Sequence, residues 1–141
     1  MKTNKTEDTA IYDEMLNYIL SSGIQEKNVS REINANSGES IIVECHSLLT
    51  IIMYYDREWT IDYFSGKITT HNHIFDIKDD FIKDLFEGDL FFLIKNRFFH
   101  RISAFSDLKF VSKDNIDKIL HKYKRKKKIK LFSVKEILID N

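Results

Sequence analysis

The chain has 141 residues, of which 43% are hydrophobic and 13% are aromatic, and its formal net charge is zero. Disordered chains combine low hydrophobicity with high net charge, so this composition excludes that class, and the length is typical of one domain. We therefore predict a single folded domain over residues 1–141.

Several other classes of protein are also excluded. No run of residues approaches the roughly 20 apolar residues that a transmembrane helix needs. The N-terminal residues, MKTNKTED, are polar, which is not the pattern of a secretory signal. The only cysteine, Cys45, cannot form an internal disulfide. These features predict a cytoplasmic protein that does not contact the membrane, and they leave its oligomeric state open.

The first predicted element is an amphipathic helix over residues 7–22. Ile11, Met15, Tyr18 and Ile19 recur there at helical spacing, and Gly23 follows as a stop signal.

The next part of the chain, up to residue 77, is rich in β-branched and aromatic residues interrupted by turn signals. The short connections between these runs exclude parallel crossovers, so we expect antiparallel strands. The predicted strands are 29–33, 41–45, 49–55, 59–64 and 68–77.

A second helix is predicted to begin at Asp79 or Asp80 and to end at Gly88. The aromatic segment 90–105 fits a β-hairpin that turns near Asn96, or a buried helix, and we favour strands.

The third predicted helix follows Ser112, which is a candidate cap, and places Ile116, Ile119, Leu120 and Tyr123 on one face. Residues 129–134 suit an edge strand, whereas Ser133 and Glu136 suit the cap of a short terminal helix. Together these elements predict an α+β fold, with an antiparallel sheet of five to seven strands packed against three helices.

Charge is distributed unevenly along the chain. Residues 1–90 contain 8 Lys and Arg against 17 Asp and Glu, a net charge of −9, whereas residues 91–141 contain 14 against 5, a net charge of +9. The asymmetry indicates charged partners, unless folding brings the two halves together so that they neutralise each other.

The acidic half contains a stripe on the predicted second helix. Asp80, Asp84 and Glu87 share one face there, and Asp76 precedes them. A basic partner would be attracted to this stripe, although acids also favour the first turn of a helix because of its dipole.

The basic half contains a run of cations that is a candidate site for nucleic-acid phosphates, or a solvated lysine-rich face. Only Tyr123 is interleaved with it as a stacking aromatic. The run consists of Lys122, Lys124, Arg125, Lys126, Lys127, Lys128 and Lys130.

Catalytic and metal sites are not predicted. His71 and His73 fall on one side of a strand, with Asp76 as a possible third ligand, but a metal needs ligands that converge from several elements. Strand alternation places Cys45 opposite to both Glu44 and His46, as a small core residue. The sequence has no glycine-rich phosphate loop, GxSxG elbow or HExxH motif, so we predict neither an enzyme nor a cofactor.

Aromatic residues lie near acidic ones in the segment 54–63, where Tyr54, Tyr55 and Trp59 are close in sequence to Asp56 and Glu58. Aromatic anchors inside an acidic rim suit a basic protein partner. Tyr54 and Tyr55 must face opposite sides of their strand, so one of them is expected in the core.

In overall character the chain resembles the immunity proteins of contact-dependent inhibition and other polymorphic toxin systems. The resemblance rests on the leaderless start MKTNKTEDTAIYDEM, the strand-rich block IIVECHSLLTIIMYYDREWTIDYF and the acidic helix DDFIKDLFEGD. These proteins share no common signature, so no site residue is transferred. The resemblance implies a cytoplasmic inhibitor that covers a toxin, often a basic nuclease, and the basic run 122–130 departs from it.

The predicted function is therefore neutralisation of a cognate basic toxin by an acidic, aromatic surface, with nucleic-acid binding through the basic run as the alternative. The predicted partner-binding residues are Tyr54, Asp56, Glu58, Trp59, Asp62, Asp76, Asp80, Asp84 and Glu87.

Overall fold

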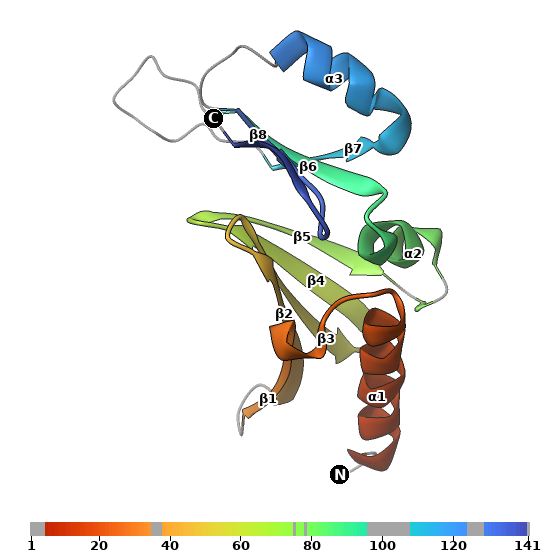
Figure 1. The fold of residues 1–141 in the computed structure, drawn as a ribbon. Coiled ribbons are helices and arrows are strands. Elements are labelled where there is room, and N and C mark those ends of the chain that lie inside the picture. Colours follow the sequence, from red (N-terminus) through yellow and green to blue (C-terminus); the bar gives the residue numbers. More distant parts are fainter. Residues whose placement is uncertain are drawn as a thin grey trace.

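The computed structural model describes residues 5–34, 38–74, 76–77, 79–95, 108–123 and 129–140 (Figure 1). Three α-helices and nine strands are present in this part of the chain. The helices are α1 (Lys5–Ser21), α2 (Asp80–Glu87) and α3 (Ile116–Tyr123). The strands are β1 (Val29–Asn34), β2 (Gly38–His46), β3 (Leu49–Asp56), β4 (Glu58–Ser65), β5 (Ile68–Ile74), β6 (Leu90–Lys95), β7 (Lys109–Ser112), β8 (Ile129–Phe132) and β9 (Ile137–Asp140).

The first five strands form an antiparallel meander in the order β1-β2-β3-β4-β5. One face of this sheet packs against α1 and α2, which lie on the same side of it (Figure 1). Met15 and Ile19 of α1 join Leu85 of α2 in the core cluster that contains the buried strand residues, of which Met53 is an example. We call this the inner face, and the opposite side the outer face.

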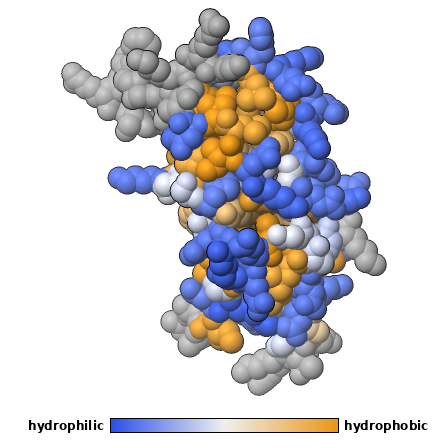
Figure 2. Space-filling view, viewed as in Figure 1, coloured by the Kyte–Doolittle hydropathy of each residue, from blue (hydrophilic) through white to orange (hydrophobic). Residues whose placement is uncertain are grey.

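A second antiparallel sheet has the order β7-β6-β8-β9 and carries α3 on its far side (Figure 1). Alternation along β6 sends Phe91 and Leu93 into a small cluster with Ile116 of α3. Hydrophobic residues are visible in the upper part of Figure 2, between α3 and this sheet. Phe92 and Ile94 point the other way and belong to the core cluster of the five-stranded sheet. Strand β6 therefore contributes side chains to both clusters.

The turn between β8 and β9 also ties the two sheets together. The ring nitrogen Nε2 of His46, at the end of β2, lies 2.6 Å from the carbonyl oxygen of Ser133. The ammonium of Lys135 donates to the carbonyl of Ser22 just after α1, at 2.7 Å. Gly88, which ends α2 with φ +86°, lies against the same lysine, because a Cβ built there would be 3.3 Å from Lys135 Cδ. Ends of α1, α2 and β2 thus meet at one turn.

The structure confirms the predicted α+β class, with antiparallel strands and three helices. The strands are divided between sheets of five and four strands. The second helix begins where predicted, since the side chain of Asp79 accepts from the backbone N–H of Phe81 at 2.9 Å. Among the described helices, none is long and apolar enough to cross a membrane.

Two predictions for the C-terminal half need correction. Residues 129–132 form β8, which lies between β6 and β9 and is therefore not the predicted edge strand. The edge strand on this side of the sheet is β9. Of the two alternatives left open for this segment, the short terminal helix is wrong, because the Ser133 hydroxyl caps a tight turn by accepting from the N–H groups of Lys135 and Glu136. For the segment 90–105 we favoured strands over a buried helix, and β6 confirms a strand at its start. The predicted turn near Asn96 lies outside the described residues.

A bulge in β2 overturns the predicted position of His46. The register shifts between Glu44 and His46, so Glu44 pairs with Thr50 whereas His46 pairs with the buried Leu49. An extra residue in a strand breaks the strict alternation of side chains. His46 therefore turns toward the core side, where its ring lies 5.4 Å from that of Phe132.

Candidate functional site on the outer face

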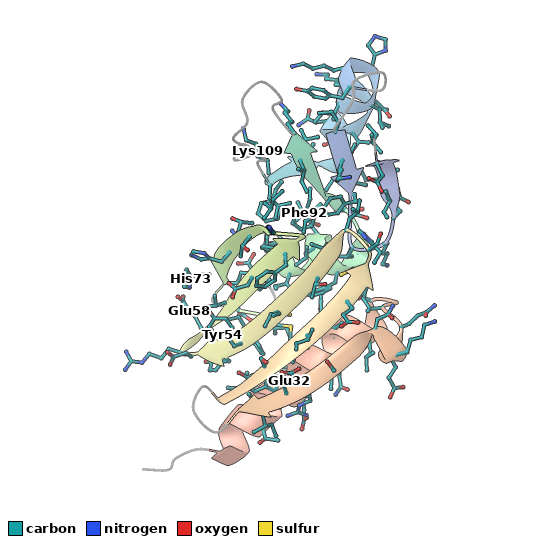
Figure 3. All side chains as sticks on the ribbon, turned by 90° about the vertical axis from the view of Figure 1, so that its left-hand side faces the viewer. Glu32, Tyr54, Glu58, His73, Phe92 and Lys109 are labelled. Carbon is teal, nitrogen blue, oxygen red and sulfur yellow. The ribbon has the colours of Figure 1, made fainter. Side chains whose placement is uncertain are left out.

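The outer face of the five-stranded sheet is not covered by any of the described helices. Figure 3 views this face, with α1 behind the sheet and with Glu32, Tyr54, Glu58 and His73 on the near side. The register places one set of alternate residues from each strand on it, because paired residues in an antiparallel sheet project to the same side.

Hydrophobic side chains occupy the middle of this face. Three partly buried residues project there from β2, β3 and β4, namely Ile42, Ile52 and Phe64. Tyr54 lies on the same face and is 37% exposed. An uncovered sheet face that mixes apolar and aromatic residues has the composition of a protein interface.

The same face carries five carboxylates, which are Glu32, Glu44, Asp56, Glu58 and Asp62. None of the described strand residues on this side is a lysine or an arginine. Arg31 of β1 projects to the inner side, where it pairs with Asp13 and Glu39. Arg57 and Lys67 stand in the turns at opposite ends of β4. The strand residues on the outer face therefore carry negative charges from β1 to β4 and no lysine or arginine.

A cluster of polar side chains lies where β3, β4 and β5 run together. Thr60 sits at its centre, with Tyr54 and His73 as its register partners on either side. The hydroxyl of Thr60 is 3.2 Å from Nδ1 of His73, and the same nitrogen is 3.1 Å from Oε1 of Glu58. The ring of His71 lies edge-on to that of His73, with centroids 5.5 Å apart.

Only some of the predicted partner-binding residues meet on this face. Tyr54, Asp56, Glu58 and Asp62 lie there together. Trp59 does not, because it projects to the inner face and is only 3% exposed. Its ring packs edge-on to Tyr12 of α1, with centroids 5.1 Å apart, so Trp59 is a core residue and not an exposed anchor.

The predicted acidic stripe belongs to a different surface. Asp80, Asp84 and Glu87 lie on α2, on the inner side of the sheet next to α1. Burial raises the pKa of Tyr18 near the end of α1, and the negative charge of Glu87 on α2 raises it further. No ion pair among the described residues neutralises the three acids of α2, whereas Asp89 faces Lys113 at 3.5 Å. Asp76 is exposed, between β5 and α2.

Sequence reasoning missed Glu32, Glu44, Ile42, Ile52 and Phe64. Side chains on one face of a sheet are two residues apart along each strand. Once the strand pairing is known, this spacing places all five residues on the same face as Tyr54.

The remaining candidate sites do not assemble. No group of three or more His, Cys, Asp or Glu side chains is placed to hold a metal ion within the part of the chain that the structure describes. His71 and His73 do share a side of β5, as predicted, but Asp76 follows the end of that strand. Of the basic run, 124–128 lies outside the described residues, and Lys122 places its ammonium 5.2 Å from the ring of Tyr123. Lys130 pairs with Asp140.

Cys45 is expected to be unreactive in the folded protein. Burial raises the pKa of its thiol to about 12, so the thiol stays protonated at pH 8, and only the thiolate attacks disulfide reagents. We expect Ellman's reagent to label the native protein at pH 8 at least about 100-fold more slowly than the urea-unfolded protein. Equal rates in both states would contradict this assignment.

The raised pKa of this thiol also makes the stability of the fold depend on pH in the alkaline range. Because its pKa is higher in the folded state, the unfolded chain loses this proton first. The contribution of Cys45 to stability is therefore complete below pH 9.0 and is lost as the pH rises toward about 12. Cys45→Ala should weaken this part of the alkaline destabilisation.

No protein family, curated protein or solved structure matched this chain in three comparisons, so the outer face is interpreted from its own chemistry.

Proposed function

We propose that this protein is a cytoplasmic protein-binding inhibitor of the immunity type, which neutralises a cognate bacterial toxin by covering it with the outer face. The supporting observation is the charge of that face, where five carboxylates lie among apolar residues and no described strand residue that projects there is a lysine or an arginine. Complementary charge accelerates association and selects partners, while buried aromatic and aliphatic side chains supply most of the affinity.

The charge also selects between partner classes. Nucleic-acid phosphates would be repelled by this face, because binding to them depends on cations. A basic protein, such as a nuclease that itself binds phosphates, would be attracted. The acids of α2 stand on the inner side, so a partner seated on the outer face need not touch them.

The test is binding to basic effector proteins, beginning with the products of the neighbouring genes, measured by calorimetry with two matched triple variants. Asp56→Lys, Glu58→Lys and Asp62→Lys together should weaken binding by at least about 100-fold, since close charge pairs at interfaces contribute roughly 2 to 5 kcal/mol. Asp80→Lys, Asp84→Lys and Glu87→Lys change the net charge equally on the other surface and should cost less than about tenfold.

Two results would refute the proposal. One is the absence of binding to any basic effector. The other is an equal loss from both triple variants, because that would show a response to net charge and not to the outer face. Circular dichroism of each variant confirms that it is folded.

A further inference from the structure

Four longer side chains stand around Thr60 on the outer face, and we call this group of five residues the receptacle. Thr60 is only 6% exposed although it faces outward, because the longer side chains of its neighbours enclose it. Tyr54 and His73 flank it from β3 and β5, and Glu58 and Asp62 stand about 7 Å before and after it along β4. Figure 3 shows Tyr54, Glu58 and His73 of this group near one another on the outer face.

The imidazole of His73 contacts two neighbours in the receptacle before any partner arrives. Its Nδ1 lies 3.1 Å from Oε1 of Glu58 and 3.2 Å from the hydroxyl of Thr60. His71 supports the same ring from the side, at 5.5 Å between centroids. Side chains that are already ordered lose less entropy when a ligand binds.

The receptacle lacks a cation of its own. Asp62 makes no ion pair or side-chain hydrogen bond with any described residue, and Glu58 has only the imidazole of His73 as an ionic partner. Tyr54 offers an exposed aromatic ring beside these two carboxylates. The combination of an aromatic ring and two carboxylates is complementary to a flat cation that can both stack and donate.

We propose that this receptacle receives an arginine side chain of the partner, an inference that rests on the proposed function. Guanidinium is planar, more weakly hydrated than ammonium, and able to stack on a tyrosine while its N–H groups reach carboxylates on two sides. A lysine ammonium satisfies the charge but does not stack in this way.

A second copy of this chain is a poor occupant. Two outer faces brought together would oppose Glu58 and Asp62 of one molecule with the same acids of the other, and neither face supplies lysine or arginine from its strands. Like charges placed opposite each other across an interface are strongly unfavourable. The charge pattern therefore favours a different, arginine-bearing protein.

The experiment uses capped hexa-arginine and hexa-lysine peptides as probes, with ¹⁵N–¹H NMR titration of the full chain. We expect hexa-arginine to bind about two- to fivefold more tightly than hexa-lysine, the contribution typical of an exposed cation–π contact. The largest amide shifts should fall at Tyr54, Thr60 and His73 and not at Glu32 or Glu44.

Four variants localise the contact. Tyr54→Ala should abolish the preference for arginine, whereas Tyr54→Phe should keep it because the ring remains. Glu58→Gln with Asp62→Asn should weaken binding of hexa-arginine more than the matched pair Glu32→Gln with Glu44→Gln, which removes the same charge from β1 and β2.

Equal affinities for the two peptides, or shifts centred on β1 and β2, would overturn the arginine assignment while a basic protein could still bind the outer face. A failure of the proposed function has a different signature, because a basic protein would then not bind this face at all.

Discussion

Alanine in place of Phe92 is expected to lower the free energy of unfolding by about 3 to 5 kcal/mol, the range found when a buried phenylalanine is truncated in a packed core. Phe92 is fully buried at 0% exposure. Its ring lies 5.2 Å from Tyr63, 5.0 Å from Phe110 and 5.6 Å from Phe132, measured between centroids. The contact with Tyr63 of β4 joins β6 to the five-stranded sheet, so the cavity would open at the junction of the two sheets.

Urea unfolding measures this loss with two probes. Trp59 is the only tryptophan and reports by fluorescence on the five-stranded sheet, whereas far-ultraviolet circular dichroism reports on both sheets. Tyr54→Ala is the control, because Tyr54 is 37% exposed and should cost no more than about 1 kcal/mol. A loss below about 1 kcal/mol for Phe92→Ala would mean that the junction contributes little and that the sheets are held together elsewhere.

The helices and the strands of the meander could be predicted from the sequence because their signals are local, whereas β7 and β9 were not predicted. Each strand of the meander is a short β-branched or aromatic run that ends at a turn residue, and α2 lies between a capping aspartate, Asp79, and a glycine, Gly88, with positive φ. These signals depend on residues within a few positions of one another, which a single sequence contains in full.

The partition into two sheets could not be predicted, because strand pairing across a long connection has no local signal. β6 pairs with β8, in which Leu93 meets Leu131, and nothing in either segment identifies its partner. The turn at Ser133 and Glu136 was ambiguous for a similar reason, since the same hydroxyl can cap a helix or a tight turn.

The candidate site was predicted in part, for a physical reason that Trp59 illustrates. Alternation shows that Tyr54 and Tyr55 face opposite sides, but it does not show which side receives a helix. α1 covers the side of Tyr55 and Trp59, which leaves Tyr54 with Asp56, Glu58 and Asp62 on the open side. The position of α1 therefore decides which aromatic residue is available to a partner.

Tyr12 fixes that position, and its replacement is the second change with a large expected effect. The β2–β3 ladder pairs Ile41 with Met53, and two residues further along the same register Glu39 would face Tyr55. The hydroxyl of Tyr12 occupies that place, because it donates to the carbonyl of Glu39 at 2.6 Å and accepts from the N–H of Tyr55 at 2.8 Å. One side chain of α1 thus completes the hydrogen bonding between two strands.

Tyr12→Phe should lower the free energy of unfolding by about 1 to 3 kcal/mol, because a partly buried N–H and a carbonyl lose their partner. Tyr12→Ala should lower it by about 3 to 5 kcal/mol, since the 3% exposed ring and its contact with Trp59 are also lost. The difference between the two variants in urea unfolding isolates the contribution of the ring.

Tyr18→Phe provides the matched control on the same helix. Tyr18 is only partly buried, and its hydroxyl makes no hydrogen bond with a described residue, so this change should cost less than about 0.5 kcal/mol. If Tyr12→Phe were as mild as Tyr18→Phe, the hydroxyl bridge would not hold α1 on the sheet. A different interaction would then have to hold α1 over the side of the sheet that contains Tyr55. The Tyr12 bridge would no longer explain why Tyr54 is the exposed tyrosine.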